Sequence, residues 1–259
     1  MRITRRPRRA ALAAVVLLLA ACAGGDERPE YVERPVDELY NEAMTLLEEG
    51  QSVAAAEAFE EVERQHPYSR WATRAMFMAA YSYYEARRYD DAIGAAERFI
   101  DWNAGSDEVP YARYLIGMSY YERISDVGRD QKMTADALGA FTRLTQRFPD
   151  SRYARDAELK LDLIRDHLAG KEMEVGRFYL ERDQYVAAIN RFQRVLAEYQ
   201  TTTHVPEALH RMVEAYTALG VMDEARRYAA VLGYNYPGSE WYERTYALVT
   251  DPDLPPVQS

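Results

Sequence analysis

The chain has 259 residues, with 42 acidic against 32 basic side chains, a formal net charge of −10 and a single cysteine. An acidic chain without a basic stripe repels phosphate backbones, so nucleic-acid binding is not expected. A lone cysteine excludes an internal disulfide, and the fold therefore has to rest on a hydrophobic core, which a chain of this length can bury.

The N-terminal segment has the layout of a bacterial lipoprotein signal. Residues 1–10 carry five arginines and no acid, residues 11–20 are apolar, and Leu-Ala-Ala precedes Cys22. The apolar run is too short for a membrane-spanning helix, which needs about 20 residues, and its flanks are typical of a cleaved signal. We predict a signal peptide over 1–21, lipidation of Cys22 as a membrane anchor, and a flexible tether over 22–34. An ordinary cleavage site with a chance cysteine is the alternative. Ala23, where inner-membrane lipoproteins carry Asp, favours the outer membrane and its periplasmic side.

A unit of helical character then repeats along the chain. Leu46, Tyr83 and Tyr120 are 37 residues apart, and so are Tyr179 and Tyr216. Three residues before them stand Ala43, Ala80, Gly117, Gly176 and Val213. A second series places Ala55, Ala92, Ala137, Ala188 and Ala225 four residues before Phe59, Ala96, Phe141, Phe192 and Ala229. Residues three and four apart share one helix face, so each unit indicates two helices that approach at small residues while an aromatic ring fills the space between them.

Three of the five units, the first, third and fifth, close with one kind of turn, written "HPYSRW", "FPDSRY" and "YPGSEW". Its proline ends the second helix, and Ser69 and Ser151 are predicted N-caps of the next one. The pattern resembles the tetratricopeptide repeat, which implies an all-α, right-handed superhelical solenoid over 35–249. Its five helix pairs are expected at about 35–67, 69–104, 108–149, 151–200 and 203–237, followed by a capping helix, "SEWYERTYALV", and a disordered tail over 250–259.

Two units depart from the regular spacing. An insertion, "SDVGRDQK" at 125–132, separates the two helices of the third unit. The fourth unit begins with an extended helix over about 151–182, and Gly170 is expected to kink it or to mark a break.

The sequence contains no recognisable catalytic constellation. None of the four histidines forms a His-Glu-x-x-His zinc signature, and no Gly-x-Ser-x-Gly elbow or glycine-rich phosphate loop is present. We therefore predict a protein that is not an enzyme and that uses no cofactor or metal.

The first helices of such repeats form a binding groove. Tyr83 and Tyr120 are predicted to pack inside their helix pairs, and the next residue in each case is turned about 100° toward the groove. An extended, aromatic-rich peptide would suit this surface, which Arg74, Arg88 and Arg113 are expected to border. Packing of the rings between repeats is the alternative. The candidate groove rings are Phe77, Tyr81, Tyr84, Tyr114 and Tyr121.

Several longer stretches resemble one family in particular. These are "HPYSRWATRAMFMAAYSYYEARRYDDAIGAAERFI", "YARYLIGMSYYERI" followed by "VGRDQ", and "KEMEVGRFYLERDQYVAAINRFQRVLAEY". Together with Cys22 they are similar to the BamD family, the outer-membrane lipoproteins of the β-barrel assembly machinery. Another periplasmic tetratricopeptide scaffold, acting in envelope or division coordination, is the alternative.

The resemblance implies an adaptor rather than an enzyme. It implies docking on a POTRA domain of the barrel-forming BamA subunit, with Asn190 and Arg191 at the contact, and association with other Bam lipoproteins. It also implies that the N-terminal repeats receive the aromatic-ending signal of unfolded outer-membrane proteins. The C-terminal segment matches the family least.

Overall fold

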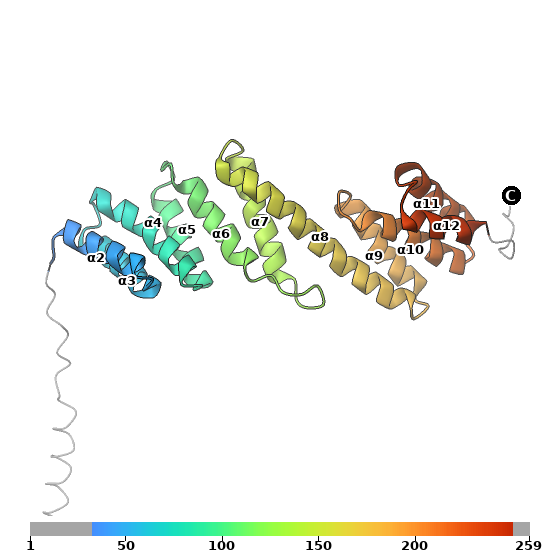
Figure 1. The fold of residues 1–259 in the computed structure, drawn as a ribbon, viewed down its shortest axis with the longest axis horizontal. Coiled ribbons are helices and arrows are strands. Elements are labelled where there is room, and N and C mark those ends of the chain that lie inside the picture. The colour runs from blue at the N-terminus through green and yellow to red at the C-terminus, as the bar shows by residue number, and fades with distance from the viewer. Residues whose placement is uncertain (1–32, 251–259) are drawn as a thin grey trace, which may run out of the picture. The chain divides into compact units, whose positions relative to one another are not determined.

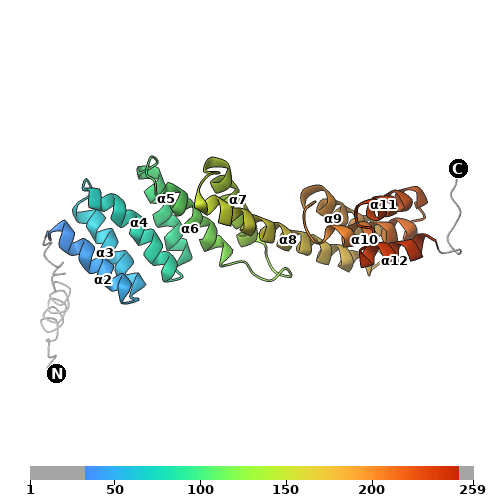
Figure 2. The same cartoon turned by 45° about the horizontal axis from the view of Figure 1, so that its top comes forward.

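The computed structural model describes residues 33–250, and the regular elements within that range are α-helices (Figures 1 and 2). In chain order these are α2 (Val36–Glu48), α3 (Ser52–Gln65), α4 (Arg70–Glu85), α5 (Tyr89–Trp102), α6 (Val109–Tyr121), α7 (Lys132–Arg147), α8 (Arg152–Leu180), α9 (Tyr185–Glu198), α10 (Val205–Ala218), α11 (Met222–Asn235) and α12 (Glu240–Val249). The predicted signal peptide, Cys22, the tether up to residue 32 and the tail from 251 lie outside the described residues.

The helices pack in the order in which they occur in the chain. Each one lies against the helix before it and the helix after it, and α12 covers both α10 and α11. The first helices of successive pairs also touch, α2 with α4, α4 with α6, α6 with α8 and α8 with α10. Within residues 33–250 the second helices α3, α5, α7, α9 and α11 make no such contact with one another. First helices therefore form an inner row and second helices an outer row, which confirms the predicted all-α repeat fold with its final helix.

The small residues of the repeat sit where two helices come closest. A Cβ atom added to Gly117 would lie 2.4 Å from the Phe141 ring, and one added to Gly176 would lie 2.4 Å from the Phe192 ring. Both phenylalanines are fully buried. The predicted pairing of a small residue on the first helix with a ring on the second is thus confirmed in these two repeats.

The identity of the facing residue also decides how deeply each repeat tyrosine packs. In the second repeat, the position equivalent to Phe141 is Ala96, and Tyr83 has room to be buried and to donate to Glu60 at 3.1 Å. In the third repeat the Phe141 ring occupies the space beside the glycine, and Tyr120 is only half-buried. Tyr83 is therefore buried as predicted, and Tyr120 also packs against the core but stays half-buried.

The repeated turn has two structural roles. Its serine caps the next helix: Ser69 accepts from the Ala72 amide, Ser151 from the Ala154 amide and Ser239 from the Tyr242 amide. This confirms the two caps predicted and adds a third. The aromatic residue that follows packs on the preceding first helix, with ring centroids 4.7 Å apart for Trp71 and Tyr40, 4.8 Å for Tyr153 and Tyr111, and 5.4 Å for Trp241 and His210.

The fourth repeat differs from its prediction at Gly170. Helix α8 is continuous through this residue, so the expected break is wrong. A Cβ at Gly170 would lie 3.2 Å from Nε2 of His204 and 3.6 Å from Val127. The glycine is needed because the insertion loop and the α9–α10 turn approach the helix closely at this point. No helix within the described range is both long and apolar enough to cross a membrane.

Candidate functional site: two interaction surfaces

A row of aromatic rings runs along the inner first helices. Tyr111 on α6 contacts Phe77 and Tyr81 on α4, with centroids 5.4 and 6.5 Å apart. On its other side it stacks on Tyr153 of α8 at 4.8 Å, and Tyr114 lies 5.6 Å from the same ring. Three successive repeats thus contribute to one continuous surface, which we call the ring row.

The ring row surrounds a hollow of about 390 Å³. Phe77, Tyr111 and Tyr153 supply its apolar wall, and Asp107, Glu108 and Arg152 supply its charged rim. The Arg152 guanidinium lies 4.7 Å from the Tyr153 centroid and donates to its hydroxyl at 2.5 Å. A hollow with rigid aromatic walls and a polar rim has the composition of a peptide-binding surface.

Burial raises the pKa values of three tyrosines in the ring row, Tyr81, Tyr111 and Tyr114, so these hydroxyl groups are protonated at physiological pH. Burial, reinforced by the neighbouring Tyr81 and Tyr153, raises the pKa of Tyr111 to about 12. Burial and a hydrogen bond to Asp156 raise the pKa of Tyr114, which donates to Oδ2 of that carboxylate at 2.5 Å. Burial alone would raise the pKa of Asp156, but hydrogen bonds from Lys160 and Tyr114 lower it overall. The carboxylate therefore stays ionised and holds Tyr114 in place.

The structure separates the predicted groove rings into two groups. Phe77, Tyr81 and Tyr114 belong to the ring row, as their contacts with Tyr111 show. Tyr84 and Tyr121 are half-buried between helices, Tyr84 beside Tyr89 at 5.9 Å and Tyr121 beside Phe141 at 6.3 Å. Each of these two rings thus contacts a ring on the second helix of its own pair.

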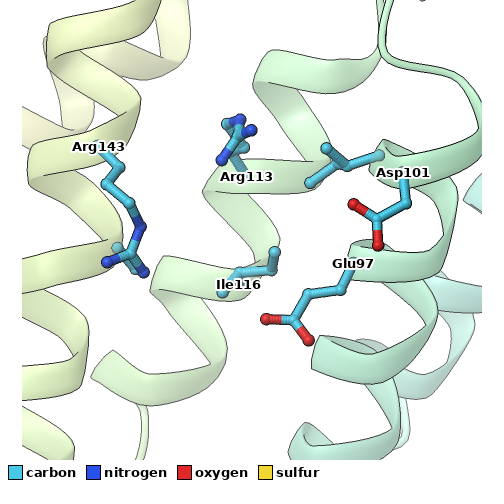
Figure 3. A pocket seen from close by; sticks show the side chains of 7 residues that line it. Glu97, Asp101, Arg113, Ile116 and Arg143 are labelled. Carbon is cyan, nitrogen blue, oxygen red and sulfur yellow. The ribbon is translucent and has the colours of Figure 1, made fainter.

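Two of the three arginines expected at the groove border, Arg88 and Arg113, lie elsewhere. Arg88 is exposed in the α4–α5 turn, where it pairs with Asp91 at 2.7 Å and covers the Tyr83 ring at 5.3 Å. Arg113 is turned to the outer side of α6, where it lines a hollow together with α5 and α7 (Figure 3). One step along a helix rotates a side chain by about 100°, so Arg113 and Tyr114 leave α6 on different sides.

Tyr153 was missing from the predicted groove although it joins the α6 rings to α8. A signal for it existed in the repeated turn, because "SRW", "SRY" and "SEW" each place an aromatic residue at the second position of a first helix. The turn sequence does not show which ring on the preceding first helix the aromatic residue contacts, which for Tyr153 is Tyr111.

A second hollow, of about 280 Å³, surrounds the predicted docking residues. It is lined by Tyr179, Ala187, Asn190, Arg191 and Arg194. Asn190 is exposed and Arg191 is half-buried. One carboxylate organises the two guanidiniums, since Arg191 and Arg194 each lie 3.0 Å from a different oxygen of Glu172. The Glu172 side chain is only 11% exposed, so it holds both guanidinium groups from the protein interior.

The described residues hold no group of three histidine, cysteine or carboxylate side chains arranged to bind a metal ion. Two other features gather functional side chains in this part of the chain: the ring row on the first helices, and the arginine hollow between the first helix α8 and the second helix α9.

Comparison with known proteins gives one consistent result. Residues 32–232 match the family model YfiO, described as an outer membrane lipoprotein. The chain is 48% identical over 238 residues to the outer membrane protein assembly factor BamD of Caulobacter vibrioides, covering 91% of this chain and 78% of that protein. It is 46% identical to the BamD of Rickettsia prowazekii, covering 83% and 86% respectively. Among solved structures, a tetratricopeptide-repeat protein of Thermus thermophilus has 17% identity and a TM-score of 0.37, covering 83% of this chain and 98% of that one.

Proposed function

This chain belongs to the BamD family of outer membrane lipoproteins, and on that premise we propose that it is a non-enzymatic adaptor of the outer-membrane β-barrel assembly machinery. In this proposal it is anchored to the outer membrane through lipidated Cys22 and faces the periplasm. It docks on a POTRA domain of a BamA-like subunit, associates with other Bam lipoproteins and receives unfolded outer-membrane proteins.

The observation that carries the client-binding part of the proposal is the ring row. Strands of outer-membrane barrels are rich in aromatic residues, and an unfolded strand presents them on an extended backbone. Rigid tyrosine rings offer such a segment a large contact area at little cost in conformational entropy. The protonated Tyr111 hydroxyl can donate to a backbone carbonyl of the segment, and Arg152 at the rim can pair with a carboxylate.

Binding of a labelled peptide with alternating aromatic residues and a C-terminal phenylalanine tests this assignment. Tyr111→Ala removes the ring at the centre of the row, and loss of a central aromatic anchor weakens binding by about thirtyfold. Tyr234→Ala is the matched control, because Tyr234 is 87% exposed on α11, away from the first helices. Equal peptide affinity of both variants and the parent protein would remove the ring row from the proposal.

The docking part of the proposal uses the hollow around Asn190 and Arg191. Glu172 holds the Arg191 and Arg194 side chains from the protein side. Each guanidinium keeps further N–H donors that can bind a carboxylate of the POTRA domain. Asn190, exposed beside them, can add a donor and an acceptor.

Affinity capture from detergent-solubilised membranes tests the adaptor role as a whole. The expected result is recovery of a barrel protein with POTRA domains together with the tagged chain. Recovery of envelope or division proteins without any such barrel protein would instead support the other periplasmic scaffold role.

The anchor has its own test. Cys22→Ala removes the only thiol available for lipid attachment, so the variant is expected in the soluble periplasmic fraction while the parent protein sediments with membranes. Persistent membrane attachment of Cys22→Ala in a strain that lacks the partner subunits would contradict lipidation.

A further inference from the structure

A charged furrow opens on the outer side of the repeats, between the second helices α5 and α7. These two helices do not touch, so α6 is accessible between them. Ile100, Ile116 and Ala140 line the apolar part of a hollow of about 280 Å³. Figure 3 shows Arg113 and Arg143 from α6 and α7 on one side and two α5 carboxylates, Glu97 and Asp101, on the other.

The arginines of this furrow lack partners. Most arginines nearby are paired, such as Arg98 with Glu60 at 2.9 Å and Arg123 with Asp90 at 2.6 Å. In contrast, no ion pair within 4.0 Å joins Arg113, Arg143 or Arg147 to a carboxylate of residues 33–250. The Asp101 carboxylate on the facing wall attracts Arg113 only from beyond ion-pair distance, and this attraction is weaker than the repulsion from Arg147 or Arg143, so the guanidinium N–H donors are not taken up by a carboxylate of the repeats.

Arg113 is the most constrained of the three. Its Nε atom is buried and has no hydrogen-bond acceptor. Burial, together with the nearby Arg147 and Arg143 guanidiniums, lowers the pKa of Arg113. A buried donor without an acceptor and a cluster of like charges both cost stability, and this cost disappears when an anion enters the furrow.

We propose that the furrow between α5 and α7 binds an acidic peptide segment of a partner protein, with one of its carboxylates held between Arg113 and Arg143. The planar guanidinium fork matches a carboxylate in two parallel hydrogen bonds. Glu97 and Asp101 on the facing wall can accept backbone N–H donors of the same segment, which inorganic phosphate does not have. The site lies on the outer side of the repeats, separate from the ring row, and so goes beyond the proposed function.

The test uses the full-length protein purified in detergent and a fluorescent hexaglutamate peptide, followed by anisotropy at low ionic strength. The chain itself carries a net charge of −10 and repels a polyacid in general, so binding reports a local positive site. Arg113→Gln with Arg143→Gln is expected to weaken binding by about tenfold or more, the equivalent of one charge-assisted hydrogen bond. Arg155→Gln, at an exposed position on α8, is the matched control and is expected to bind like the parent protein.

Arg143 is exposed, so Arg143→Gln alone keeps the test valid if the double variant is unstable. Unchanged hexaglutamate binding in the Arg143→Gln and double variants overturns the proposal. It is also overturned if inorganic phosphate or phosphatidylglycerol vesicles bind more tightly than the peptide in an Arg143-dependent manner, because the furrow then selects phosphate. Weakened peptide binding together with failure of equimolar phosphate to compete supports the acidic peptide.

Discussion

Glu172 pairs with both Arg191 and Arg194, so we expect the contributions of the two arginines to stability to be coupled. Substitution of the two arginines measures this coupling. Arg191→Gln removes one of two guanidiniums, each 3.0 Å from a Glu172 oxygen. A hydrogen bond to a charged group contributes about 1.5–3 kcal/mol. Arg191 is 39% and Arg194 48% exposed, so solvent screening reduces the loss to about 1 kcal/mol for either single variant.

The double variant is expected to lose more than the sum of the singles. With both arginines replaced by Gln, the Glu172 carboxylate, 11% exposed, has no cation left beside it, and an unpaired buried charge costs about 3–5 kcal/mol. Glu172→Gln added to the double variant should recover much of this. Urea unfolding followed by circular dichroism gives the free energy of unfolding of the parent protein and of each variant. Strict additivity of the two single changes would refute a shared carboxylate.

The same variants separate folding from docking. If the hollow binds a POTRA carboxylate, Arg191→Gln should weaken docking by about thirtyfold, the equivalent of about 2 kcal/mol for a truncated interfacial charge pair, while unfolding changes by only about 1 kcal/mol. Arg191→Glu is the poorer probe, because it places a second carboxylate next to Glu172 and changes both properties together. Equal losses in docking and in stability would show that the residue acts only through the fold.

Three further predictions concern the fold. Gly176→Ala puts a methyl group 2.4 Å from the Phe192 ring and should cost about 1–3 kcal/mol of unfolding free energy. Gly94→Ala on α5, where a methyl group has no other atom within 4 Å, should instead gain about 0.5–1 kcal/mol. Chemical denaturation compares the two variants, and equal effects would contradict the packing argument. Ser151→Ala removes the α8 cap and should cost about 1 kcal/mol, most of which Ser151→Asp should restore. The pKa of Tyr111 is raised to about 12 in the folded protein, so the unfolded chain loses this proton first, and the free energy of unfolding should fall as the pH rises from about 10 to 12. Tyr111→Phe should make this decrease in stability smaller. An unchanged pH dependence in the variant would exclude Tyr111 as a cause of the decrease.

Much of the fold can be predicted from local sequence patterns. The alternation of small and aromatic residues at three and four predicted the helix pairs because those spacings lie on one helix face whatever the rest of the chain does. Ser69 and Ser151 could be recognised as caps because a cap bonds an amide only three residues away. Even the loop that replaces the regular turn between α6 and α7 was visible as excess spacing between repeats.

The functional surfaces were harder to predict because they combine residues from different repeats. Tyr111 and Tyr153 meet only because α6 and α8 lie side by side in the inner row. Arg113 was assigned to the groove side, yet it lies on the outer side, since a single step along the helix separates it from Tyr114. Sequence spacing gives the angle between two side chains on one helix but does not give the angle between successive helix pairs.

By itself, the sequence determined that this protein is a chain of helix pairs closed by a final helix, since helix formation, capping and pairing depend on residues near one another. Tertiary structure alone decided that Gly170 serves close approach to His204 instead of a break in α8, and that Glu172 joins Arg191 to Arg194. The same holds for the unpaired arginines between α5 and α7. These features depend on how one repeat is rotated against the next, which packing across the whole interface sets and no short stretch of sequence records.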